Sequence, residues 1–379
     1  MIINRESLSK NIEKRIKTDL EEHKVSGASV IVKQSGETVY KNCFGTTMPG
    51  GDKPVTFDTI FRLASMTKPI TAVAIMILVD RKMLSLDDAV GKYLPEFKEM
   101  FICNIDEEGR LINTEKAKNE VTILHLLTHT SGIGSGDIGN MQSEKMTEKD
   151  RETLESTVHY FSKQGLAFEP FTKEAYSPFA AFDILVAIIE KITGEDYNDF
   201  IKRNIFIPCM MRDTTFVPSQ EQWNRLITMH NRENKKSCIG YTTDNCVFEK
   251  FPCKHYVGGA GLISTIEDYS NFAEMLLNYG CFEGHRIMSK ESVNLISKPH
   301  FPKYIQLGTE SWGLGVRVIV GDDNRLPVGS YGWSGAYGTH FWIDPVNKIT
   351  AIYMKNSLYD GGAGAVTAYN FEKDVYEAL

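Results

Sequence analysis

Two serine–lysine pairs in this chain have the spacing that nucleophilic catalysis could use. Ser65 and Lys68 are three residues apart, as are Ser7 and Lys10, so the members of each pair would share one face of a helix. Negative charge developing on a serine is favoured at a helix N-terminus. A buried lysine beside it is driven toward the neutral form, which can accept the serine proton. The spacing alone therefore predicts two candidate nucleophiles.

The flanking sequence separates the two pairs. Ser65 and Lys68 precede the run from Ile70 to Val79, which is apolar on almost every side. Such a run is typical of a helix buried all round at the centre of a domain, and Pro69 would lie in its first turn, where proline is tolerated. The pair at Ser7 instead lies in a charged N-terminal helix. We therefore predict that Ser65 is the nucleophile and that Lys68 belongs to its activating machinery.

A tyrosine could complete the proton-transfer chemistry. Tyr176 stands in the segment Tyr-Ser-Pro that ends at Pro178, just before an apolar helical run. Nearby cations such as Lys68 could lower its pKa and make it a general base. A packed tyrosine whose hydroxyl caps a loop would give the same sequence. From the residues alone both interpretations stay open.

A glycine segment near the C-terminus could supply an oxyanion hole. Gly335 follows Trp333 and Ser334 and would let the backbone come close to a ligand. The amide of Ala336 could then pair with the amide of Ser65 to hold a developing oxyanion. An ordinary turn between two strands is the alternative interpretation of this segment.

The elements that must position these residues alternate along the chain between sheet-forming and helical character. Helical spacing or a capping-box pattern indicates helices at 8–20, 182–192, after Ser264 and at 364–378, and β-prone runs occupy 28–32, 38–40, 315–320, 340–343 and 349–354. We predict an α+β fold with an antiparallel sheet flanked by helices and formed by both termini. Residues 1–85 and 255–379 would form this domain, and residues 86–254 an inserted, mainly helical one, with the active site in the cleft between them.

Composition limits the partners and the compartment. The chain has 379 residues, a net charge of -7 and 24% charged residues, which argues against nucleic acid or an anionic membrane as a partner. No run approaches the roughly 20 apolar residues of a membrane span, and no signal peptide precedes the first helix, so we expect a cytoplasmic protein. Seven cysteines without a C-x-x-C pair indicate reduced thiols. His125 and His129 lack the H-E-x-x-H pattern, and we expect neither a metal nor a cofactor.

The order S-x-x-K, then Y-S-x, then W-x-G resembles the serine β-lactamase and penicillin-recognising superfamily. The chain is most similar to class C β-lactamases and family VIII carboxylesterases, with further likeness at 123–132, 259–265 and 335–339. The resemblance implies a β-lactamase/transpeptidase-like fold. It also implies that Ser65 is acylated, that Lys68 is the motif lysine, that Tyr176 is the general base and that the amides of Ser65 and Ala336 form the oxyanion hole. Substrate contacts are then expected from Trp333, Gly335 and Tyr337.

Two departures from the β-lactamase pattern bear on the substrate. Pro178 stands where β-lactamases usually carry asparagine, and Trp333 replaces the lysine of their K-T-G motif. A substrate carboxylate would lose an attraction at Trp333, as the W-x-G of family VIII esterases implies. We therefore predict a serine hydrolase that cleaves neutral carboxylic esters through an acyl-enzyme on Ser65. The alternatives are a β-lactamase or D-amino-acid peptidase with the same nucleophile, or a catalytically silent binding member. The oligomeric state and the acceptor of the acyl group stay open.

Overall fold

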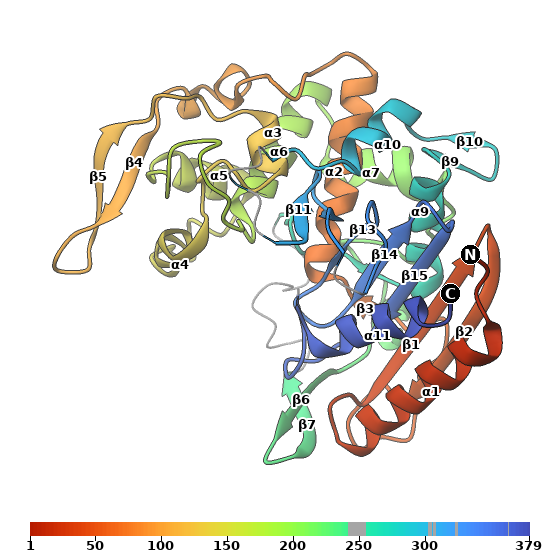
Figure 1. The fold of residues 1–379 in the computed structure, drawn as a ribbon. Coiled ribbons are helices and arrows are strands. Elements are labelled where there is room, and N and C mark those ends of the chain that lie inside the picture. Colours follow the sequence, from red (N-terminus) through yellow and green to blue (C-terminus); the bar gives the residue numbers. More distant parts are fainter. Residues whose placement is uncertain (242–254, 302–304, 306–307, 323–324, 363) are drawn as a thin grey trace.

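A seven-stranded antiparallel sheet lies at the centre of the molecule (Figure 1). The computed structural model describes residues 1–241, 255–301, 305, 308–322, 325–362 and 364–379. Both ends of the chain enter the sheet, and β1 pairs with β15, so the predicted sheet formed by both termini is confirmed. In spatial order the strands are β11 (Glu310–Trp312), β12 (Arg317–Ile319), β13 (Tyr331–Ser334), β14 (His340–Asp344), β15 (Ile349–Met354), β1 (Gly27–Gln34) and β2 (Glu37–Gly45).

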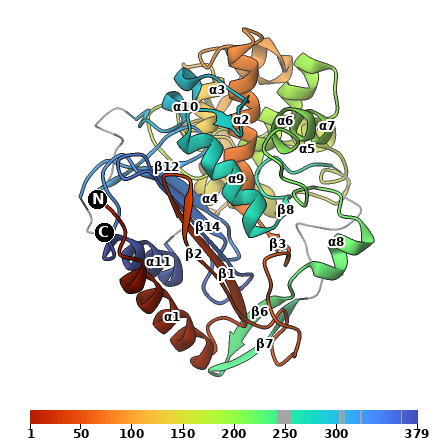
Figure 2. The same cartoon turned by 90° about the vertical axis from the view of Figure 1, so that its right-hand side faces the viewer.

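Helices cover both faces of this sheet (Figure 2). Successive strand residues point to opposite faces, so Trp342 packs into one apolar cluster and its neighbour Phe341 into the other. The cluster that contains Trp342 includes the buried side of α1 (Arg5–Glu21) and of α11 (Val366–Tyr376). The cluster that contains Phe341 includes residues of α2 (Thr67–Asp80), α9 (Ile266–Leu277) and α10 (Lys290–Ile296). The predicted first and last helices are therefore confirmed as the cover of one sheet face.

Helix α2 is buried from its first residue through Leu78. A short 3-10 turn, η1 (Ala64–Met66), leads directly into it. The prediction that Ser65 opens a helix buried all round is confirmed, with Pro69 in the first turn. The competing pair at Ser7 lies in α1, where Lys10 is exposed.

The middle of the chain holds the predicted helices and two hairpins that the sequence analysis did not predict. The hairpin of β4 (Phe101–Ile105) and β5 (Leu111–Lys116) projects from the body (Figure 1), and its mostly exposed residues show no regular alternation of apolar and polar types. The second hairpin joins β6 (Met229–Glu233) and β7 (Lys236–Tyr241). The helices here are α3 (Ile123–Leu127), α4 (Gly136–Glu144), α5 (Leu154–Ser162), α6 (Ala180–Thr193), α7 (Tyr197–Ile201), η4 (Lys202–Phe206) and α8 (Gln220–Arg225).

The predicted domain boundaries near residues 86 and 254 stay predictions. Residues 242–254, at the end of the predicted helical domain, lie outside the described residues, as do Cys246 and Cys253. Within the described part of the chain the five remaining cysteines are free thiols. Gly194 ends α6 in the left-handed conformation, which glycine adopts readily.

The predicted helix start at Ser264 is wrong by one residue. Thr265 is the N-cap of α9, and its side chain accepts a hydrogen bond from the amide of Asp268. Ser264 belongs instead to the short strand β8 (Ile263–Ser264), where it lies opposite Phe61 of β3 (Phe61–Arg62). The backbone of Ser264 is therefore used in strand pairing, and the next residue with a hydroxyl group, Thr265, caps the helix.

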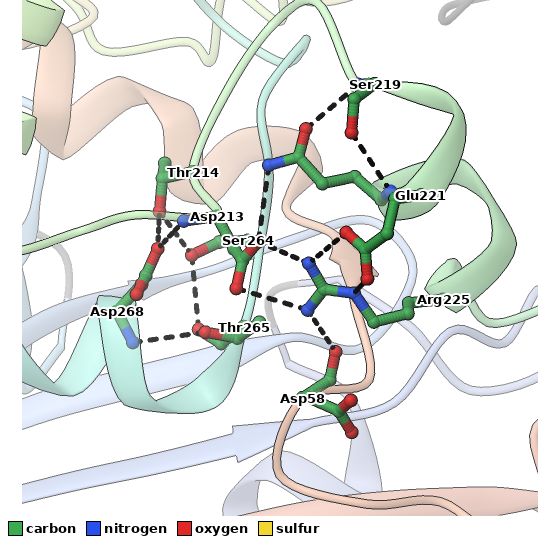
Figure 3. A network of polar contacts seen from close by, with 10 residues as sticks. Asp58, Asp213, Thr214, Ser219, Glu221, Arg225, Ser264, Thr265 and Asp268 are labelled. Atoms are coloured by element: carbon green, nitrogen blue, oxygen red, sulfur yellow. Dashed lines mark hydrogen bonds and ion pairs between the residues drawn. The ribbon is translucent and has the colours of Figure 1, made fainter.

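A polar network ties α9 to the loop before β3 (Figure 3). The amide of Asp213 and the hydroxyl of Thr214 donate to Asp268 Oδ2 at 2.7 and 2.9 Å. Arg225 forms an ion pair with Asp213 and donates to the carbonyl of Asp58 at 2.9 Å. Because β3 leads directly into η1, this network holds the segment that delivers Ser65.

We expect Asp268→Asn to change how stability depends on pH. Burial raises the pKa of Asp268 to about 6, against about 3.9 in an unfolded chain. Between these values only the folded state keeps the proton, so wild-type stability falls as pH rises, by about 2–3 kcal/mol in total. Asparagine does not titrate and can accept the same two hydrogen bonds. Urea unfolding should therefore show the variant gaining stability relative to wild type from about pH 4 to about pH 7; parallel pH profiles would contradict this.

Candidate active site

The predicted nucleophile and its two predicted partners meet in the structure. Ser65 Oγ lies 3.2 Å from Lys68 Nζ and 2.8 Å from the hydroxyl of Tyr176. Ser65 is partly exposed in the middle of η1, whereas Lys68 is fully buried one turn further along the helical segment. The side chains of Lys68 in α2 and Tyr176 in the loop before α6 therefore both contact the hydroxyl oxygen of Ser65 in η1. Such an arrangement can move a proton to and from a serine hydroxyl.

Lys68 is held by backbone carbonyls. Its Nζ donates to the carbonyl of Pro178 at 2.6 Å and to that of Gly259 at 2.8 Å. Burial lowers the pKa of Lys68 below its usual value, and interaction with Tyr176 opposes the shift. Burial therefore favours a neutral amine that can accept a proton. Pro178, which replaces the usual asparagine, contributes its carbonyl to orient this lysine.

The turn that presents Gly259 is fixed by buried polar contacts. Gly258 donates its amide to Asp183 of α6 at 2.9 Å, and its carbonyl accepts from Thr71 of α2 at 2.7 Å. A side chain on Gly259 would place Cβ 2.6 Å from the carbonyl oxygen of Pro178 and 3.1 Å from Lys68 Nζ. The close approach of the two carbonyls to the lysine thus requires glycine here.

Tyr176 is positioned by His129, one of the two histidines weighed above as metal ligands. The Nδ1 atom of His129 accepts from the amide of Ser177 at 3.1 Å, its carbonyl accepts from the amide of Ala175 at 3.1 Å, and its ring lies 4.6 Å from the Tyr176 ring. Burial lowers the pKa of His129 well below its usual value. The neutral imidazole and the backbone carbonyl of His129 therefore hold the residues on either side of the tyrosine.

The segment predicted as an oxyanion hole packs directly against the nucleophile turn. Thr339 Oγ1 donates to the carbonyl of Leu63 at 3.0 Å, and the amide of Gly335 donates to the carbonyl of Thr339 at 2.7 Å. A Cβ atom on Gly335 would lie 2.1 Å from the same Leu63 oxygen. Ala64, next to the nucleophile, has φ of 46°, a conformation that costs energy for a non-glycine residue. Ala336 follows Gly335 and is exposed.

An aromatic wall stands beside the tyrosine. The Trp333 ring lies 5.6 Å from Tyr176, and the Trp312 ring lies 4.5 Å from Trp333 and 6.0 Å from Tyr176. The indole of Trp312 donates to the carboxylate of Glu174 at 2.6 Å. Tyr337 is buried in a small cluster with Ala64 and Met229, so its predicted substrate contact stays a prediction.

Sequence reasoning missed two residues that shape this region. Trp312 completes the aromatic wall, and its rarity as one of four tryptophans was the available signal. Asn356 accepts from the amide of Arg62 at 2.9 Å and donates to its carbonyl at 3.1 Å. This clamp joins the end of β15 to the strand that precedes Ser65. No local pattern marks it, because the two residues are far apart in sequence.

The described residues contain no cluster of three or more side chains suited to holding a metal ion. His125 is used instead to cap α3, where its Nδ1 accepts from the amide of Thr122 at 3.2 Å. None of the helices in the described part of the chain combines the length and apolar character that crossing a bilayer requires.

Comparison with known proteins shows the family to which the chain belongs. The profile of the Beta-lactamase family matches residues 12–372. The chain belongs to the Beta-lactamase family. It is 29% identical to protein Rv1367c of Mycobacterium tuberculosis over 91% of this chain and 89% of that protein. It is 27% identical to the esterase EstB of Burkholderia gladioli over 92% and 90%.

A solved structure shares the fold of this family member over nearly its whole length. EstCE1, described as a hydrolase with promiscuous acyltransferase activity, superposes with a TM-score of 0.81 at 22% identity and covers 98% of this chain and 99% of its own. The predicted β-lactamase/transpeptidase-like fold and the predicted superfamily are thus confirmed.

We expect Gly335→Ala to destabilise the protein and to reduce activity in this family member. The new Cβ would clash with the Leu63 carbonyl, and overpacking of this kind costs about 1–3 kcal/mol. Urea unfolding and ester turnover measure the two effects. Gly194→Ala is the control, since nothing lies within 4 Å of its Cβ and only the left-handed backbone costs about 1 kcal/mol. Unchanged turnover in Gly335→Ala would contradict the close packing of the two turns.

Proposed function

We propose that this protein is a serine hydrolase that cleaves carboxylic esters through an acyl-enzyme on Ser65. The observation that carries the proposal is the placement of Ser65 Oγ within hydrogen-bonding distance of both Lys68 Nζ and the Tyr176 hydroxyl. Family membership and the likeness to an esterase support it. The substrate is a small-molecule ester, and no cofactor takes part.

The proton follows a short path in the proposed reaction. Ser65 Oγ attacks the ester carbonyl carbon while its proton passes to the Tyr176–Lys68 pair. Burial lowers the pKa of the lysine, which favours its proton-accepting form. The same pair returns the proton to the departing alkoxide, which leaves as the alcohol. Water then attacks the acyl-enzyme carbonyl carbon and gives a proton to the same pair. The pair returns a proton to Ser65 Oγ as the carboxylic acid is released.

The oxyanion forms where the two packed turns meet. The amides of Ser65 and Ala336 are the proposed donors to the carbonyl oxygen as it becomes negative. Their turns are held together by the contacts of Leu63 with Thr339 and Gly335. Preorganised donors of this kind need little rearrangement when charge develops, which is the source of their catalytic effect.

The proposed acyl and alcohol groups are neutral and partly apolar. Trp333 and Trp312 present aromatic surface beside Tyr176, and Trp333 occupies the position at which the K-T-G lysine of β-lactamases would meet a substrate carboxylate. This favours esters over β-lactams or peptides with a C-terminal carboxylate.

Transfer of the acyl group to an alcohol is a second candidate activity. It uses the same acyl-enzyme and differs only in the acceptor that attacks it. EstCE1, whose fold this chain shares, is described as having promiscuous acyltransferase activity. Product analysis with an added short alcohol distinguishes the new ester from the free acid.

We expect Ser65→Ala to abolish hydrolysis of p-nitrophenyl butyrate, with kcat/KM lowered by about a thousandfold or more because no acyl-enzyme can form. Ser7→Ala is the matched control, since Ser7 has the same spacing to a lysine but lies in α1. It should retain wild-type turnover. Mass spectrometry of the acylated peptide locates the ester on Ser65. Equal rates for wild type and Ser65→Ala would overturn the proposal, and failure of a fluorophosphonate to label the protein would favour a silent binding member.

We expect Trp333→Lys to shift preference toward substrates with a carboxylate. A new ionic hydrogen bond contributes about 1.5 kcal/mol or more, so the ratio of kcat/KM for nitrocefin to that for p-nitrophenyl butyrate should rise about tenfold. Trp333→Leu loses the ring without adding charge and should leave this ratio near the wild-type value. Fast nitrocefin turnover by the wild type would instead favour the β-lactamase alternative.

A further inference from the structure

A chain of buried polar side chains crosses the sheet behind the predicted oxyanion segment. Ser334 Oγ lies 2.8 Å from His340 Nδ1, and His340 Nε2 lies 3.0 Å from Glu372 Oε1 on α11. Glu372 is also paired with Arg317 of β12 and, at 2.9 Å, with Arg325. Ser334, His340 and Glu372 are at most 6% exposed, so this chain lies out of reach of substrate.

The charges of this chain determine its hydrogen-bond directions. Burial alone would raise the pKa of Glu372, but the charge of Arg317 and the close contact with His340 outweigh it and lower the pKa to about 2. Burial lowers the pKa of His340, so its ring is neutral. An ionised carboxylate can only accept, so the ring proton lies on Nε2. Nδ1 is then an acceptor, and the hydroxyl of Ser334 donates to it.

This hydrogen bond closes the turn that carries Ala336. Ser334 and His340 are directly paired across β13 and β14, and residues 335–339 form the connection between them. Inside that connection Gly335 donates to Thr339, and Gly338 donates to Gly335 at 2.9 Å. The side chains of Ser334 and His340 therefore brace the base of the turn on the face opposite Trp333.

We propose that Ser334, His340 and Glu372 form a positioning relay that holds the Ala336 amide in place for the oxyanion. The relay anchors the 335–339 turn to α11 through a carboxylate that two arginines keep ionised, and it does not touch substrate. The inference rests on the proposed function. It adds that catalysis depends on a buried contact between the sheet and the last helix.

The test compares Ser334→Ala with wild type in hydrolysis of p-nitrophenyl butyrate. A displaced donor matters most when the oxyanion is fully developed. We therefore expect kcat to fall about tenfold while KM stays within about twofold, since a single complete oxyanion donor is worth a hundredfold or more. Phenylboronic acid, which forms a tetrahedral adduct on an active serine, should bind about tenfold more weakly for the same reason.

Asp374→Asn is the matched control on the same helix. Asp374 is buried and pairs with Arg15 of α1 at 2.5 and 2.6 Å, so its loss weakens α11 packing without touching the relay. It should lower the melting temperature and leave kcat and boronic acid affinity unchanged. The relay is overturned if Ser334→Ala keeps wild-type kcat and affinity, or if Asp374→Asn loses both equally. Activity that survives Ser65→Ala would instead overturn the proposed function itself.

Discussion

The burial of one lysine is the constraint on which the rest of this structure depends. Lys68 lies fully buried at the start of an apolar helix, where its amine would be costly without hydrogen-bond acceptors. The carbonyls of Pro178 and Gly259 meet that need. They come from two segments that are distant in sequence, so the hydrogen bonds that these carbonyls accept from buried Lys68 also place the loop of Tyr176 beside Ser65.

Contacts between distant segments also hold the other side of the site, at the turn that carries Ser65. The carbonyl of Leu63, two residues before the nucleophile, accepts from Thr339 and packs on Gly335. Asn356 holds the backbone of Arg62 from the end of β15. The central sheet therefore grips both sides of the nucleophile turn, which allows Ala64 to keep a left-handed conformation that isolated peptides disfavour. Stability and catalytic geometry share these contacts.

Much of the fold could be predicted from local sequence patterns, because the periodicity of helices and strands and the burial of their apolar residues are visible in the sequence. Helix α2 is apolar on almost all sides, and β1 and β2 contain the β-prone runs 28–32 and 38–40, so these elements were predicted. The start of α9 was misplaced by one residue because Ser264 and Thr265 are both good caps, and only the pairing of β8 with β3 decides between them. The β4–β5 hairpin was missed because its strands are short and their apolar and polar residues do not alternate regularly.

The sequence by itself determined the chemistry available to this protein: a serine and a lysine one turn apart on a buried helix, a tyrosine in a loop, and a tryptophan where β-lactamases carry lysine. Tertiary structure alone decided how these residues meet. The clamp of His129 on the Tyr176 loop, the carbonyl cradle of Lys68 and the Ser334–His340–Glu372 contacts each join segments through hydrogen bonds or charged contacts at specific distances. Local sequence encodes helix period and apolar faces, whereas a contact between remote segments exists only once the whole chain has packed.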